Sequence, residues 1–119
     1  MIAIVDYGVG NLFSLSSSLK LIGADAVVTN DAEVIRKADK VILPGVGAFG
    51  DAMAKLEGYG LVDVIHEITK EGKPFLGICL GLQLLFEESE ETPGVEGLSI
   101  LKGDIKRIPD KEDLKIPHI

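Results

Sequence analysis

The chain has 119 residues, 46% of them hydrophobic, and a formal net charge of -7. It is long enough for one domain with its own core, and its acidic surface would repel nucleic acid phosphates and anionic lipids. A single cysteine excludes an internal disulfide and no apolar run reaches membrane-spanning length, so we expect a reducing, cytoplasmic setting with proteins or small molecules as partners.

The first part of the chain alternates strand-like and helix-like segments. Residues 1–6 are a short apolar run that predicts a strand, and residues 12–23 repeat leucines at helical spacing. Residues 25–29 predict a second strand, and residues 31–38 predict a brief helix capped by its first residue, an aspartate. Residues 40–44 predict a third strand that a proline ends.

The alternation continues beyond the third strand. Residues 48–58 predict a helix interrupted by glycine, and residues 61–72 repeat apolar side chains on one helical face before a terminal glycine. Residues 74–78 predict a fourth strand, which runs straight into a helix at residues 80–89. Residues 93–108 are punctuated by glycine and have a β-like pattern.

This alternation indicates the fold class. Strands that are apolar throughout, each followed by a helix, are typical of parallel strands buried on both faces. We therefore predict an α/β fold, a doubly wound parallel sheet with helices on both faces. Ligands bind such sheets at the carboxyl ends of the strands, so the glycine-rich loops at residues 7–11, 44–50 and 77–83 should share one edge.

The lone cysteine, Cys79, lies between Gly77 and Gly81 where the fourth strand meets a helix. This is the pattern of a nucleophile elbow, in which a strained turn exposes the nucleophile and flanking side chains would collide with the strand and helix. The start of a helix also favours the thiolate. We expect an unusual backbone conformation at Cys79. Helical torsions with a buried sulfur would instead indicate an inert core cysteine.

Two neighbouring features fit a cysteine nucleophile, which needs hydrogen-bond donors for the oxyanion formed on attack. The loop Pro44–Gly47 has little side-chain bulk over its backbone N–H groups, and the N–H of Leu80 is the usual second donor. Gln83 lies one helical turn after Cys79 and could bind the head group of an amino-acid substrate. Taken alone, the loop is equally typical of an ordinary glycine-rich turn, and Gln83 taken alone is more typical of an exposed helix glutamine.

Other motifs are less informative. The segment DYGVGN lacks the third glycine of a dinucleotide-binding fingerprint, and the third strand lacks the phosphate-accepting aspartate of a receiver domain. The acidic run from Glu87 to Glu91 is typical of a solvated face, although one carboxylate could hold a substrate ammonium group. His66 lies off the apolar face of its helix and His118 is the penultimate residue, so we expect neither as a base. No metal-ligand spacing is present.

Three segments resemble a known family. IAIVDYGVGNLFSL, VILPGVGAFGDAM and GICLGLQLLFEESEE are similar to signature segments of the glutamine amidotransferase subunits of imidazole glycerol phosphate synthase, class-I amidotransferases of histidine biosynthesis. The resemblance covers the whole chain. It implies that Cys79 is the glutaminase nucleophile and that Gly47 and its loop form the oxyanion strand. It further implies that Gln83 and Glu91 contact glutamine, and we also expect Gly45 to contact the substrate.

The resemblance implies an activity and a partner. Glutamine would be hydrolysed to glutamate and ammonia through a cysteine thioester, without a cofactor, and the ammonia would pass to a (β/α)8-barrel cyclase subunit. The family's catalytic histidine and glutamate lie in a C-terminal region that these residues do not include. We therefore expect residues 1–119 to be the N-terminal portion of a single amidotransferase domain, truncated at its C-terminal side and inactive alone.

Alternatives to this interpretation remain. The chain could be a non-catalytic α/β scaffold or assembly piece that associates with a complementary C-terminal segment or with itself. It could also be another class-I amidotransferase, or a cysteine hydrolase with the same elbow. Labelling of Cys79 by a glutamine affinity reagent would separate the scaffold from the enzymes, and copurification with a cyclase would exclude another amidotransferase or a cysteine hydrolase.

Overall fold

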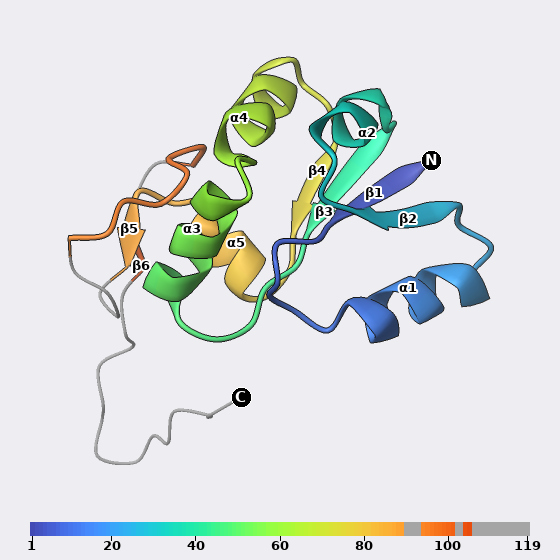
Figure 1. Cartoon of the computed structure of the whole chain (residues 1–119), viewed down its shortest axis with the longest axis horizontal. Helices are drawn as coiled ribbons and strands as arrows, with labels where there is room; N and C mark the ends of the chain where they lie inside the picture. The colour runs from blue at the N-terminus through green and yellow to red at the C-terminus, as the bar shows by residue number, and fades with distance from the viewer. Residues whose placement is uncertain (90–93, 102–103, 106–119) are drawn as a thin grey trace, which may run out of the picture.

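A computed structural model describes residues 1–89, 94–101 and 104–105 of the chain, and Figure 1 shows its arrangement. Four parallel strands form the central sheet in the order β2-β1-β3-β4. The strands are β1 (Ile2–Val5), β2 (Ala26–Thr29), β3 (Lys40–Leu43) and β4 (Phe75–Gly77). The predicted parallel α/β sheet is therefore confirmed, with all four strands at the predicted places in the sequence.

In the described part of the chain five helices follow or connect these strands, and Figure 1 shows α1 beside β2, apart from α3, α4 and α5. They are α1 (Leu12–Leu21), α2 (Ala32–Lys37), α3 (Phe49–Gly58), α4 (Val62–Lys70) and α5 (Leu80–Leu84). A second, two-stranded parallel sheet joins β5 (Glu88–Ser89) to β6 (Asp104–Ile105). No helix within the described ranges has the length and apolar character needed to cross a membrane.

Local chemistry explains where several helices begin and end. Asn11 caps α1 by accepting from the Ser14 N–H at 3.2 Å, and Asp31 caps α2 by accepting from the Glu33 N–H at 2.9 Å. A side-chain acceptor at this position satisfies an N–H that has no partner within the helix. Gly72 follows α4 with a φ of 84°, a conformation that glycine adopts without steric cost.

Alternation along the strands gives the sheet two faces. One face contributes its side chains to the main core, where residues from α2 to α5 also pack: Ala3, Val5, Val41, Leu43, Ile35, Phe49, Leu56, Ile65, Ile68 and Leu84. The opposite face presents Ile4 and Ile42, both buried, and Leu76, which is 55% exposed. No residue of α1 is buried.

The structure corrects two helix predictions. The segment predicted as an interrupted helix is the continuous helix α3, because its buried face outweighs the roughly 1 kcal/mol penalty of an internal glycine, Gly50. The helix predicted at residues 80–89 ends at Leu84, and β5 follows. The early end has a tertiary cause: the N–H groups of Leu98 and Ile100 donate to the carbonyls of Leu84 and Leu85, at 2.8 and 2.9 Å.

Candidate active site at the carboxyl ends of the strands

Three loops meet where β1, β3 and β4 end, as the sequence predicted. The Tyr7 hydroxyl donates to the Pro44 carbonyl at 2.6 Å. The Ile78 N–H donates to the Leu43 carbonyl at 3.0 Å, and the Leu80 N–H donates to the Gly45 carbonyl at 3.2 Å. The loop after β3 is therefore held between the loop after β1 and the turn after β4.

Cys79 lies between β4 and α5 and has the backbone conformation predicted for an elbow. Its φ is 54° and its ψ is -121°, and its side chain is exposed. A positive φ is uncommon for a residue with a side chain and is retained where the surroundings impose it. An exposed cysteine in a strained turn does not match the alternative of an inert core cysteine.

The glycines on either side of Cys79 lie where a side chain does not fit. A Cβ on Gly81 would be 1.9 Å from the Leu43 carbonyl oxygen, and a Cβ on Gly77 would be 2.7 Å from the Leu82 Cα. Both contacts are with backbone, which cannot rotate away as the end of a side chain can. The two glycines thus allow the turn to pack directly against the end of β3 and the first turn of α5.

The loop Pro44–Gly47 is tightly packed at its start and open at its end. A Cβ on Gly45 would be 2.8 Å from both the Gly81 nitrogen and the Tyr7 hydroxyl oxygen. By contrast, a Cβ on Gly47 would meet nothing within 4 Å, its φ is 96°, and Val46 is 58% exposed. Of the two proposed oxyanion donors, the Leu80 N–H already has the Gly45 carbonyl as its acceptor in this structure.

Tyr7 is a site residue that the sequence analysis did not identify. Its side chain is fully buried, and burial raises the pKa of the phenol well above its ordinary value, so the hydroxyl stays protonated and able to donate. The residue appeared in the sequence only as part of the turn-like segment DYGVGN. Its position directly after a buried strand was a weak signal that its ring would enter the core.

Of the other candidate residues, the structure describes Gln83 and His66. Gln83 is half-buried on α5, and its backbone N–H donates to the Cys79 carbonyl at 3.4 Å. His66 is exposed, as predicted, and its Nε2 also lies 2.6 Å from the Leu98 carbonyl oxygen, a contact that ties α4 to the segment after β5. Glu91 and His118 lie outside the described residues.

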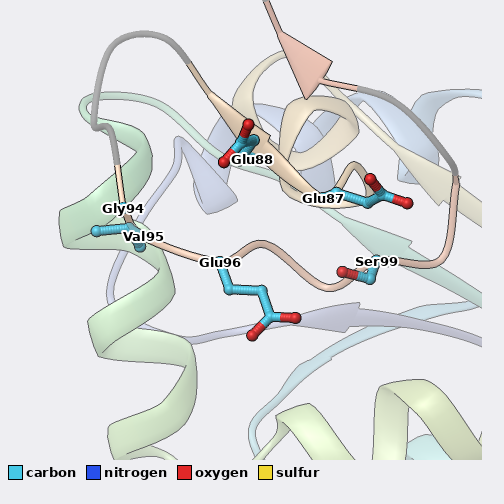
Figure 2. Close-up of a pocket in the computed structure, with 6 residues that line it drawn as sticks. All are labelled: Glu87, Glu88, Gly94, Val95, Glu96 and Ser99. Atoms are coloured by element: carbon cyan, nitrogen blue, oxygen red, sulfur yellow. The ribbon is translucent and has the colours of Figure 1, made fainter.

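A pocket of about 510 Å³ adjoins β5 and is shown in Figure 2. Its lining includes three carboxylates and small neighbours: Glu87, Glu88, Gly94, Val95, Glu96 and Ser99. The first two carboxylates belong to the acidic run predicted to be solvated, and both are exposed. Among residues 1–89, 94–101 and 104–105, no three acidic, histidine or cysteine side chains are grouped so that they could hold a metal ion.

Comparisons with known proteins show the family of the chain. The family model described as "Glutamine amidotransferase class-I" matches residues 3–115. Two curated relatives, each named "Imidazole glycerol phosphate synthase subunit HisH", are 55% identical in Methanothermobacter thermautotrophicus and 56% identical in Bacillus cereus strain G9842. Both matches cover 100% of this chain but only 58% and 56% of those proteins, so the chain spans little more than half their length.

Two solved structures share the fold. One, titled "Crystal structure of glutamine amidotransferase", has a TM-score of 0.75 and 23% identity over 90% of this chain and 57% of its own. The other is a putative peptidase E protein from Listeria monocytogenes EGD-e, with a TM-score of 0.66 and 13% identity over 84% of this chain and 62% of its own. At these identities the likeness supports the fold alone.

Proposed function

The chain belongs to the class-I glutamine amidotransferase family, and from this premise we propose that the full-length protein is the glutaminase subunit of imidazole glycerol phosphate synthase. The observation that carries the proposal is Cys79, which is exposed and strained between two glycines that have no room for a side chain. The identity of 55% to a protein named as a subunit of that synthase supports the choice within the family.

In the proposed reaction, the Sγ of Cys79 attacks the side-chain amide carbon of glutamine. The carbon–nitrogen bond breaks, the nitrogen takes up a proton and leaves as ammonia, and a thioester remains. Water then adds to the thioester, the carbon–sulfur bond breaks, and glutamate leaves with the thiol restored. The proton transfers need a general acid-base, which the family resemblance assigns to a histidine outside this sequence, supported by a glutamate.

Charge develops on the amide oxygen during the attack, and the N–H groups of Gly47 and Leu80 are the proposed donors to it. The Leu80 N–H reaches that oxygen only by exchanging its present acceptor, the Gly45 carbonyl. We propose Gly45, Gln83 and Glu91 as substrate contacts. Gln83 supports this assignment by lying one helical turn from Cys79 on the same short helix.

The proposed partner is a cyclase subunit with a (β/α)8 barrel, which receives the ammonia and forms imidazole glycerol phosphate. Hydrolysis coupled to such a partner avoids losing ammonia to solvent. A cytoplasmic location is part of the same proposal, because a free catalytic thiol needs a reducing environment. The relatives support the partner through their printed name, which describes each of them as a subunit of the synthase.

The test is glutamate release by the full-length product of the gene, mixed with its cyclase subunit. We expect Cys79→Ala to lower turnover about a thousandfold or more, because triad members act as a unit. Ser18→Ala, at an exposed position on α1, is the control and should leave turnover unchanged. Full turnover in Cys79→Ala would contradict the proposal.

A second arm uses the 119 residues alone. Without the family's histidine we expect at most one slow acylation at Cys79 and no sustained turnover, since a general acid-base contributes roughly a hundred- to ten-thousandfold. Activity is expected to appear when a separately expressed C-terminal segment and the cyclase are added. Sustained turnover by the 119 residues alone would mean that His66 or His118 acts as the base.

A further inference from the structure

Tyr7 is a fully buried polar residue at the edge of the sheet that carries Cys79. It follows the last residue of β1 by two positions, and its hydroxyl donates to the Pro44 carbonyl at 2.6 Å. That short hydrogen bond joins segments 37 residues apart in the sequence. The proposed chemistry of Cys79 makes no direct use of this phenol, so its burial at this place calls for another role.

The bond fixes the point where the loop Pro44–Gly47 leaves β3. Proline has no N–H, so Pro44 cannot extend the ladder of the sheet through its own nitrogen. Its carbonyl is held by Tyr7 from the β1 side, and the next carbonyl, that of Gly45, accepts from the Leu80 N–H at 3.2 Å on the β4 side. Two successive carbonyls are therefore held from two different loops.

Packing reinforces the same point. The Tyr7 hydroxyl oxygen lies 2.8 Å from the place where a Cβ on Gly45 would stand, so the phenol fills the space beside that glycine. A Cβ on Gly10 would lie 3.3 Å from the Pro44 Cβ, which shows how closely the loop after β1 approaches the proline. Beyond Gly45 the loop is open, since a Cβ on Gly47 would meet nothing within 4 Å.

We propose that Tyr7 is a positioning residue whose hydroxyl fixes the Pro44–Gly45 peptide at the end of β3 and thereby sets the loop that carries the Gly47 N–H relative to Cys79. The hydrogen bond of Tyr7 is independent of the proposed glutaminase function, but its expected effect on catalysis rests on that function. Donors placed in advance at an oxyanion lower the barrier of the chemical step, and small displacements weaken them. Because Tyr7 is buried beneath the loop and holds the peptide that includes Gly45, a proposed substrate contact, its loss should disturb both the chemical step and substrate binding.

The first experiment compares Tyr7→Phe with Tyr59→Phe in the full-length protein with its cyclase subunit. Tyr59 is the other tyrosine of the chain and is 47% exposed, so it is a matched control. We expect Tyr7→Phe to lower kcat about five- to tenfold, the loss typical of one buried hydrogen bond. Both variants are assayed well below the lower of their two melting temperatures. A kcat equal to that of Tyr59→Phe would overturn the proposal.

The second experiment is independent of turnover. Amide hydrogen exchange at Leu80 reports how firmly its N–H is held against the Gly45 carbonyl, and we expect it to be faster in Tyr7→Phe than in wild type or Tyr59→Phe. Placing 4-aminophenylalanine at position 7 restores a donor on a ring of the same shape and should restore the slower exchange. Unchanged exchange in Tyr7→Phe would overturn the role of Tyr7, whereas an inactive wild-type protein would overturn the proposed function instead.

Discussion

The two faces of the central sheet differ in how completely they are covered. On the face that joins the main core, the side chains of the two central strands are essentially inaccessible: Ala3, Val5, Val41 and Leu43. On the same face, Val27 of the edge strand β2 is 37% exposed. On the other face Ile4 and Ile42 are buried, but Leu76 on the edge strand β4 is 55% exposed. The elbow belongs to the covered side, because Leu80 and Leu84 from the helix after Cys79 are part of that core.

The helices α4 and α1 also differ in how many of their apolar side chains are buried. Both repeat apolar side chains at helical spacing, and α4 buries Val64, Ile65 and Ile68. In α1 no residue is buried, and Phe13 and Leu21 are 83% and 88% exposed. A helical pattern thus predicts that a helix forms, but whether the apolar side chains of that helix are buried depends on the elements packed against it. The strained turn at Cys79 is supported where that packing is complete.

The largest expected effect is at the contact between the elbow and β3. Gly81→Ala would place a Cβ 1.9 Å from the Leu43 carbonyl oxygen, so either the elbow or the strand end must move. We expect a loss of about 4 kcal/mol or more in the free energy of unfolding, measured by urea denaturation. Gly58→Ala in α3, where a Cβ meets nothing, is the control and should be neutral or slightly stabilising. Equal effects would show that the elbow is not packed as described.

The next effect compares the two helices directly. Ile65→Ala in α4 removes a fully buried side chain, and we expect it to lower the free energy of unfolding by about 2–5 kcal/mol. Leu21→Ala in α1 removes a side chain that is 88% exposed, and we expect it to change the free energy of unfolding by less than about 0.5 kcal/mol. Thermal denaturation of the two variants measures the difference. Similar losses in both would mean that α1 is covered in solution, for example by self-association, which sedimentation would detect.

The smallest effect concerns strain at the nucleophile. With a φ of 54° and a ψ of -121°, Cys79 has a conformation that glycine tolerates far better than a residue with a side chain. We expect Cys79→Gly to be more stable than Cys79→Ala by about 1–2 kcal/mol, although both lack the thiol. Denaturant unfolding of the two variants gives this difference. A less stable glycine variant would show that the covered face does not hold the turn in this conformation.

Much of the fold and part of the site could be predicted because the relevant signals are local. Apolar runs followed by helical patterns predicted the parallel strands, and the spacing Gly77-x-Cys79-x-Gly81 predicted the strained turn. Each of these patterns can be recognised within a few residues of the sequence, although the contact that excludes a side chain at Gly81 is with the distant Leu43 carbonyl. The periodicity of α4 likewise predicted its buried face correctly.

The features that were not predicted depend on partners distant in the sequence. The end of α5 at Leu84 follows from the Leu98 N–H taking that residue's carbonyl, and His66 is held by the Leu98 carbonyl. The bond between Tyr7 and Pro44 likewise links separate loops. No local sequence pattern predicts such a hydrogen bond, because a tyrosine that follows a strand can equally well be exposed to solvent. The hydrogen bond from the Leu80 N–H to the Gly45 carbonyl is likewise a contact between residues distant in the sequence.

The parallel topology has a consequence for the order in which the site forms during synthesis. Tyr7 leaves the ribosome first, its acceptor Pro44 follows 37 residues later, and Cys79 is the last of the three, in the turn after β4, the strand that pairs with β3. Parallel pairing is non-local, so β1 must wait for β2 and β3 before a sheet exists. The end of β3, against which Gly81 packs, is therefore synthesised before the nucleophile that the elbow presents.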